Sequence, residues 1–213
     1  MDRIEQICSR FERCGVFADV GCDHGYCTQY MLKNNLCDRA VISDISQKSL
    51  NKARLLLKDY FAAGRVSAVC CDGLIGVKEA DLVLIAGMGG DEILKILQQG
   101  YIPEKFVFQP MSNVAKLREY LLERGCGITE DNIFKDGKFY FIIKGVRQGC
   151  NEKYSPEQLA FGKDSLKNPV LREYLGEEAE KIRGYLARGM REENRQMLIG
   201  RLKFLTGVYS GET

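Results

Sequence analysis

The feature that most constrains this chain is an alternation of short apolar runs with longer amphipathic ones between residues 16 and 125. The apolar runs have the length of strands and are rich in Val, Ile and Phe: VFADVG, RAVISD, RVSAVCCD, DLVLIAG and KFVFQP. Short apolar strands joined by amphipathic helices are typical of a parallel sheet with helices on both faces. We therefore expect an α/β fold built from five strand-helix units.

After Gly125 the pattern changes to two β-rich runs, about Ile128 to Phe134 and Phe139 to Val146. Asp136-Gly137 between them is the strongest short hairpin signal in the sequence. A mostly parallel sheet that ends in an antiparallel hairpin is the Rossmann-like architecture of class I methyltransferases, which use S-adenosylmethionine (SAM), rather than of dinucleotide-binding proteins. The order of elements predicts a seven-stranded sheet of this kind, which is an analogy of fold alone.

Helix signals flank this region at both ends. Asp2 begins a capping box for a leading helix, which we expect to stop at Gly15. Near the other end, Asn168-Pro169 combines an N-cap with a proline at the first helical position, and a second run of helical spacing follows this helix. We expect a methyltransferase domain over residues 1–150 and a helical-hairpin, coiled-coil-like extension over residues 151–213.

The charge balance excludes a strongly basic nucleic-acid coat, because 31 Lys and Arg face 29 Asp and Glu, for a net charge of +2. Any RNA-binding surface must therefore be local. No apolar run approaches the roughly 20 residues that a membrane span needs, and the start, MDRIEQICSRFERCG, has no long apolar stretch. These features predict a cytoplasmic protein with no membrane partner. The sequence does not determine the oligomeric state, and a monomer is slightly favoured.

Nine cysteines are scattered along the chain, with only Cys70 and Cys71 adjacent. No C-x-x-C pair occurs, and the single histidine cannot complete a mixed zinc site. We expect free, buried thiols in a reducing compartment and no metal.

The first glycine turn, Asp19 to Tyr26, reads DVGCDHGY and follows the first predicted strand. Open α/β sheets bind ligands at the carboxyl ends of their strands, and Gly21 lets the backbone turn tightly or approach a ligand. Asp19 and Asp23 would repel a pyrophosphate, but they would attract the sulfonium and α-ammonium groups of SAM. The turn therefore favours SAM over a dinucleotide.

Two other residues of this turn have more than one interpretation. His24 either holds the turn in shape through a hydrogen bond or takes a direct part in the chemistry. Tyr26 is either a core residue of the following helix, which is slightly favoured, or lies against a ligand ring.

Acidic residues also end the second and third predicted strands. Asp44 lies twenty-three residues after Gly21, a separation at which an acid commonly accepts hydrogen bonds from a ribose diol. Asp72, followed by Gly73, can accept a hydrogen bond from an adenine amino group. The alternative for either aspartate alone is a helix N-cap, but three acids at three successive strand ends favour a ligand site.

The fourth and fifth strands end in further candidate loops. Gly87 to Gly89 open a helix, and these glycines serve either close strand-helix packing or the approach of a flat base. In the following loop Gln109 and Asn113 either read a base edge or, with Pro110, form a turn and a helix cap.

Taken together, these motifs resemble those of the bacterial tRNA (adenine-22-N1)-methyltransferase family, in the same order and at similar spacing over nearly the whole chain. The motifs are ADVGCDHGYCTQYML, VISDIS, CCDGL, IAGMGG, FQPMSNVAKLREYL and SPEQLAFGKDSLKNPVLREYL. The resemblance implies a class I methyltransferase domain with a helical extension, SAM as the methyl donor and a tRNA adenine in the D-arm region as the acceptor.

The resemblance also implies which residues bind the donor. They are Asp19, Gly21, Cys22, Asp23, Tyr26, Asp44, Ile45, Asp72, Gly73, Gly87, Met88 and Gly89. The chain departs from the family pattern at Cys22 and Gly25, where serine and alanine are expected, and at Met111, where an asparagine is expected. If that asparagine holds the target base, its role here passes to Ser112 or Asn113 or is absent.

Adenine N1 already carries an in-plane lone pair, so the predicted reaction depends mainly on positioning an extruded base. A carboxylate near N6 would stabilise the positive charge that spreads over the ring. We assign this role to Asp23, with His24 as support or alternative.

For the RNA backbone the candidates are Arg188, Arg191 and Arg195, which lie close together near the expected turn of the helical extension. Their alternative is a solvated face with ion pairs to Glu192 and Glu193.

Three other functions compete with this interpretation. A nicotinamide-dependent oxidoreductase lacks support, because no G-x-G-x-x-G follows the first strand. A methyltransferase-fold protein that binds RNA without catalysis is disfavoured by the intact donor loops. A methyltransferase of a small molecule is disfavoured by the helical extension, which suits a large substrate.

Overall fold

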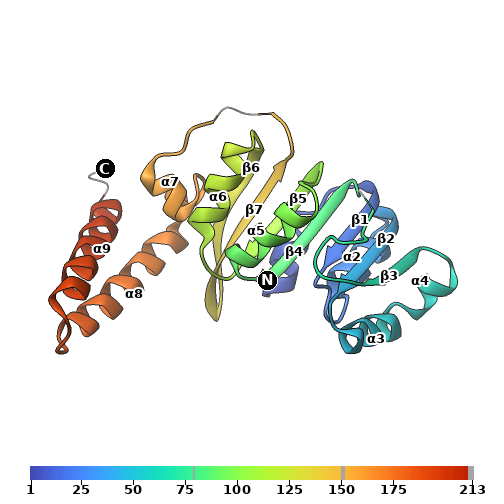
Figure 1. Ribbon diagram of the computed structural model, residues 1–213, viewed down its shortest axis with the longest axis horizontal. Coiled ribbons are helices and arrows are strands. Elements are labelled where there is room, and N and C mark those ends of the chain that lie inside the picture. The colour runs from blue at the N-terminus through green and yellow to red at the C-terminus, as the bar shows by residue number, and fades with distance from the viewer. Residues whose placement is uncertain (79, 150–151, 211–213) are drawn as a thin grey trace.

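A computed structural model of the chain describes residues 1–78, 80–149 and 152–210 (Figure 1). The expected boundary between the two domains falls on residues 150 and 151, outside the described residues, and so does Cys150. The other eight cysteines are free thiols, of which Cys70 is exposed and Cys71 half-buried rather than buried as expected.

The described residues form the predicted seven-stranded sheet. Its strands are β1 (Cys14–Val20), β2 (Cys37–Asp44), β3 (Val66–Cys70), β4 (Leu82–Met88), β5 (Lys105–Pro110), β6 (Gly127–Asp136) and β7 (Lys138–Val146). They lie in the order β3-β2-β1-β4-β5-β7-β6. The first five strands pair in parallel, and β7 runs antiparallel to both β5 and β6. This sheet confirms the predicted methyltransferase-like architecture, including the hairpin at Asp136-Gly137.

The helices occupy most of the predicted positions. They are α1 (Arg3–Cys8), α2 (Tyr26–Lys33), α3 (Gln47–Leu56), α4 (Lys58–Ala62), α5 (Gly90–Gln99), α6 (Val114–Glu123), α7 (Pro156–Phe161), the 3₁₀ turn η1 (Ser165–Lys167), α8 (Pro169–Leu186) and α9 (Glu192–Ser210). The capping box at Asp2 is present, but α1 ends at Cys8 rather than at Gly15.

The third strand-helix unit is also incomplete, because the described residues between β3 and β4 form turns instead of a helix. Gly73 and Gly76 take positive φ angles of 60° and 83° there, which interrupt a right-handed helix.

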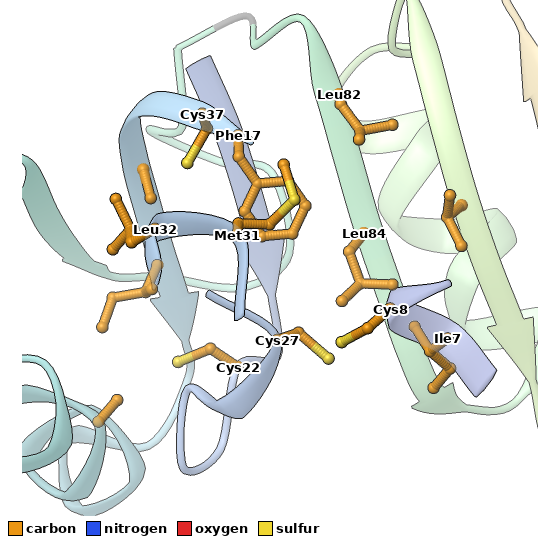
Figure 2. Packing of buried hydrophobic residues seen from close by; sticks show 14 of the residues in the cluster. Ile7, Cys8, Phe17, Cys22, Cys27, Met31, Leu32, Cys37, Leu82 and Leu84 are labelled. Carbon is orange, nitrogen blue, oxygen red and sulfur yellow. The ribbon is translucent and has the colours of Figure 1, made fainter. Parts of the chain in front are cut away.

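Helices cover both faces of the sheet. On one face, Ile7 and Cys8 of α1 pack with Met31 of α2 against Phe17 and Leu84 (Figure 2). On the other face, α5 and α6 pack on the alternate residues of the same strands. This alternation follows from the two-residue period of a strand. The start of α1 lies at the carboxyl end of β4, where the Arg3 guanidinium approaches Gly87.

The C-terminal helices form the predicted hairpin. Figure 1 shows α8 and α9 side by side beyond β6, at the opposite end of the molecule from α3 and α4. Leu171, Leu175 and Ile182 of α8 and Leu205 of α9 are buried in one cluster with Ile133 of β6. The hairpin therefore docks on the antiparallel edge of the sheet while its turn projects outward.

A fully buried ion pair joins α6 to β6, and its arginine also contacts the extension. Arg118 of α6 donates from Nε to both oxygens of Asp131 on β6, at 2.9 and 2.8 Å, and both side chains have 0% exposure. Arg118 also donates to the carbonyl oxygens of Leu159 and Ala160 in α7. One guanidinium therefore links elements of both predicted domains.

Candidate active site

A cavity of about 550 Å³ lies at the carboxyl ends of β1 to β4. Its walls come from the turn after β1, the residues that follow β2 and β3, the end of β4, and α1. This is the edge at which open α/β sheets bind ligands, and the cavity has the size of a small-molecule pocket.

The cavity brings together nearly all the residues predicted to bind the donor. Those that line it are Asp19, Gly21, Cys22, Asp23, Tyr26, Asp44, Ile45, Asp72, Gly73, Gly87 and Met88. His24 lines it as well, whereas Gly89 lies outside the lining and is the N-cap residue of α5.

Asp19 is the buried acid of the site, with 4% of its surface exposed. The hydroxyl of Thr28 donates a hydrogen bond of 2.8 Å to Asp19 Oδ2. Removal of this carboxylate from water raises its pKa to about 6, although the hydrogen bond from Thr28 partly lowers it. A cation bound beside Asp19 would favour the ionised form.

Gly21 and Met88 pack against each other across the sheet edge. Gly21 has a φ of +73°, and a Cβ built on it would lie 2.1 Å from Met88 Cε. A larger residue at Gly21 would push the terminal methyl of Met88 aside and would be strained by the positive φ, so both the turn and the contact favour glycine.

Asp23 and His24 form a pair at the mouth of the cavity. His24 Nδ1 lies 2.7 Å from Asp23 Oδ2, and Lys52 Nζ of α3 lies 3.7 Å from Asp23 Oδ1. Asp23 has a φ of +44°, a strained conformation of the kind that clusters at functional sites. The side chain of His24 is 42% exposed and that of Asp23 is 60% exposed, so both can be reached from the opening of the cavity.

Tyr26 is not the core residue that the sequence favoured. It is 51% exposed at the start of α2, and its ring stacks on that of His24 with centroids 5.6 Å apart. Tyr26 lies on the exposed side of α2, whose buried side is formed by Cys27, Thr28, Met31 and Leu32.

Asp44 and Asp72 do not act as helix N-caps. The N-cap of α3 is Ser46, whose backbone N–H donates to Asp44 Oδ1 at 2.8 Å. The backbone N–H of Asp23 donates to Asp44 Oδ2 at 3.3 Å, so Asp44 also braces the first turn. Asp72 precedes a turn and pairs with Lys95 Nζ at 3.4 Å. Both aspartates keep a place in the cavity wall.

Of the residues predicted to read a base edge, one is buried in the protein and two line a second cavity. Gln109 is fully buried, and its Oε1 accepts a hydrogen bond of 2.9 Å from Arg3 Nε. Pro110 and Asn113 line a second cavity beside the first, and the Asn113 amide donates to Asp91. In this arrangement the carboxamide of Gln109 positions Arg3 rather than facing a ligand.

The three arginines of the extension lie at and beside the turn between α8 and α9, and all are exposed. Arg195 donates to the carbonyl oxygen of Leu186, and Arg188 lies over the ring of Tyr185. Within the described part of the chain none of them pairs with Glu192 or Glu193, so their guanidinium groups are open to a partner.

The cavity wall also contains residues that were not predicted to belong to the site, among them Arg3, Ile4 and Ile7 of α1 and Glu92 of α5. Arg3 is the only arginine or lysine among the lining residues, and it lies over the ring of Tyr140 and beside Gly87. No motif marks it, because its position depends on the long-range packing of α1 on the sheet.

The charges of the cavity suit a zwitterionic cation. Five carboxylates line it, from Asp19, Asp23, Asp44, Asp72 and Glu92, against the single guanidinium. Among the described residues no three His, Cys, Asp or Glu side chains converge on a possible metal position. Nor is any helix within those residues long and apolar enough to cross a membrane.

Comparisons with known proteins agree with this geometry. The sequence model of the methyltransferase-domain family matches residues 1–143. The *Bacillus subtilis* tRNA (adenine(22)-N(1))-methyltransferase is 30% identical over 167 residues, which cover 75% of this chain and 70% of that protein. The chain belongs to the bacterial tRNA (adenine-22-N1)-methyltransferase family.

Two further relatives of this methyltransferase support the assignment. A *Mycoplasma pneumoniae* protein is 34% identical over 150 residues, covering 68% of this chain and 70% of the relative. A *Streptococcus pneumoniae* protein solved in complex with SAM is 25% identical and superposes with a TM-score of 0.86, covering 98% of this chain and 100% of that one. The superposition includes α8 and α9, so the helical extension belongs to the shared fold.

Proposed function

We propose that this chain transfers the methyl group of SAM to N1 of adenine 22 in tRNA. The observation that carries the proposal is the acidic cavity at the carboxyl ends of β1 to β4, in a chain of this methyltransferase family. We further propose that the protein acts in the cytoplasm, where tRNA is modified, and as a monomer.

The residues present fit the donor. Asp44 and Asp72 offer carboxylates to the ribose diol and the adenine amino group, and the exposed side chain of Ile45 offers an apolar surface to the adenine ring. Asp19 balances the α-ammonium group, while Arg3 is suited to the α-carboxylate, for which no other arginine or lysine lines the cavity.

When bound, SAM supplies an electrophilic methyl group. The protein must hold adenine N1 in line with it and exclude water. Asp23 lies at the mouth of the cavity, held by His24 and Lys52, where a carboxylate can balance the charge that grows on the adenine ring. Tyr26, stacked on His24, gives an exposed aromatic face to the same opening.

The extension would grip the tRNA backbone. Arg188, Arg191 and Arg195 gather at the exposed turn of α8 and α9 (Figure 1), where they can contact phosphates away from the cavity. Such contacts would supply affinity, whereas the cavity selects the base.

The test is transfer of labelled methyl from SAM to unmodified tRNA transcripts with adenine or guanine at position 22. We expect label only on the adenine transcript, as N1-methyladenine. Asp23→Ala should lower kcat by about 10²- to 10⁴-fold if Asp23 acts on the ring, whereas Asp59→Ala on the exposed surface of α4 should not.

Absence of label on both transcripts despite measurable SAM binding would contradict the tRNA assignment, and it would favour a small-molecule substrate or RNA binding without catalysis. A rise in the SAM Kd with unchanged kcat for Asp23→Ala would limit Asp23 to donor binding.

A further inference from the structure

The second cavity, of about 330 Å³, lies where the loop after β5 meets β7 and the C-terminal helices. Its walls include Phe139 and Phe141 of β7, Tyr174 of α8 and Arg201 of α9. The function proposed above uses neither this cavity nor its aromatic lining.

The aromatic walls are held in place before any ligand arrives. Phe139 and Phe141 each meet the Tyr174 ring edge-on, with centroids 5.3 and 5.7 Å apart. The ring centroid of Phe141 also lies 5.2 Å from the guanidinium carbon of Arg118. Arg118 is itself held by its buried ion pair with Asp131. A pocket of fixed rings loses little conformational entropy on binding.

Three polar groups at this cavity make no hydrogen bond and no ion pair within the described residues. Neither the Ser112 hydroxyl nor the Tyr174 hydroxyl makes a hydrogen bond, and the Arg201 guanidinium makes no ion pair, lying instead over the rings of Phe161 and Phe204. Burial raises the pKa of Tyr174, so its hydroxyl stays a donor. The site thus combines flat apolar walls with hydroxyl donors that make no hydrogen bond among the described residues and a guanidinium that pairs there with no carboxylate.

Backbone hydrogen bonds join the wall of the second cavity to that of the donor cavity. The backbone N–H of Met111 donates to the carbonyl oxygen of Met88 at 2.8 Å, and that of Gly90 donates to the carbonyl oxygen of Ser112 at 2.8 Å. Met88 lines the first cavity, while Met111 and Ser112 line the second. A polynucleotide whose target base lies at the opening of the first cavity can therefore extend along this joined wall toward the second.

We propose that the second cavity binds an unpaired nucleobase of the tRNA next to the target adenine, stacked on the Phe139 side of the cavity, with a phosphate of the same strand on Arg201. Single-stranded bases are commonly recognised by stacking on aromatic side chains beside a basic group. Capture of this neighbour would hold the target extruded, and the inference rests on the proposed tRNA substrate.

The test measures the Kd of the full chain, loaded with S-adenosylhomocysteine, for tRNA transcripts with a single abasic nucleotide at each of the two positions on either side of the target. Phe139→Leu keeps apolar bulk but removes the ring, and it should raise the Kd for intact tRNA roughly 5- to 20-fold. At one of the abasic positions the Kd of the wild type should rise by a similar factor. On that transcript Phe139→Leu should cause no further rise in Kd.

Matched controls come from the far end of the molecule, where Arg54 lies over the Phe61 ring, 5.1 Å from its centroid. Phe61→Leu and Arg54→Gln should leave the Kd unchanged. Arg201→Gln should reduce the slope of log Kd against log salt concentration by about one, the signature of one lost phosphate contact.

The proposal is overturned if Phe139→Leu and each abasic substitution weaken binding independently, or if neither weakens it. Should Phe139→Leu fail to fold, an unchanged salt slope for Arg201→Gln overturns the proposal by itself. Methyl transfer by the wild type is measured separately. If Phe139→Leu and one abasic position have non-additive effects on the Kd but no methyl is transferred, the proposed reaction is contradicted. If methyl is transferred but the two effects are additive, only this site is contradicted.

Discussion

At the scale of single residues, Asp19 links the chemistry of the site to pH. Its folded-state pKa of about 6 lies above its ordinary value of 3.8 because it is buried. This group's contribution to the stability of the free protein is therefore lost as pH rises from about 4 to 6. SAM binding has the opposite dependence, since its ammonium group favours the ionised carboxylate.

We predict that the SAM Kd rises as pH falls below about 6, approaching about tenfold per pH unit. Isothermal titration between pH 5 and 8 measures this directly. Asp19→Asn should bind SAM weakly with little pH dependence in that range, and an unchanged pH profile in the variant would show that another group titrates.

Arg3 allows a second prediction at this scale. Arg3→Gln should raise the SAM Kd about 10- to 100-fold, as expected for the loss of a hydrogen-bonded charge partner. Methylthioadenosine has no amino-acid end, so its Kd should stay the same, whereas Arg3→Lys should recover part of the SAM affinity. Equal weakening for both ligands would mean that Arg3 only supports the cavity wall through Gln109.

Residue types and spacing predicted most of the cavity lining, because acids and glycines at strand ends are local signals. The same reasoning missed Arg3, whose place depends on Ile7 and Cys8 packing against the sheet (Figure 2). The favoured interpretation of Tyr26 as a core residue was wrong, because the sequence alone does not show which side of a helix faces the sheet.

At the scale of elements, the sequence predicted all seven strands because each is a short apolar run or half of a hairpin marked by Asp136-Gly137. It placed the end of α1 too late, since Gly15 belongs to β1. The count of five strand-helix units was one too high over the described residues, because Gly73 and Gly76 in positive φ impose turns between β3 and β4. Long periodic segments were thus predicted better than short connections.

The start of α8 gives a prediction for an element. Asn168 Oδ1 accepts from the backbone N–H of Val170 at 3.0 Å, and its amide donates to Asn132 Oδ1 and to the carbonyl oxygen of Ile133, both at 2.8 Å. Asn168→Ala should lower the free energy of unfolding by about 1–3 kcal/mol, measured by urea denaturation. Asn168→Asp keeps the cap but loses the donors, so it should lie between the wild type and the alanine variant.

At the scale of the whole molecule, the Arg118–Asp131 pair joins α6 to β6, and the same guanidinium donates to the carbonyl oxygens of Leu159 and Ala160 in the extension that we propose to bind tRNA. A buried charge left alone is costly, so Arg118→Met or Asp131→Leu should each destabilise the fold by about 3–5 kcal/mol. The double variant removes both charges and should recover much of that loss, which a double-mutant cycle in urea measures. If the double variant regains stability yet binds tRNA more weakly than the wild type, the pair also fixes the geometry between the two parts. If tRNA affinity returns together with stability, the pair serves folding alone, and the fixed rings of Phe141 and Tyr174 do not depend on it.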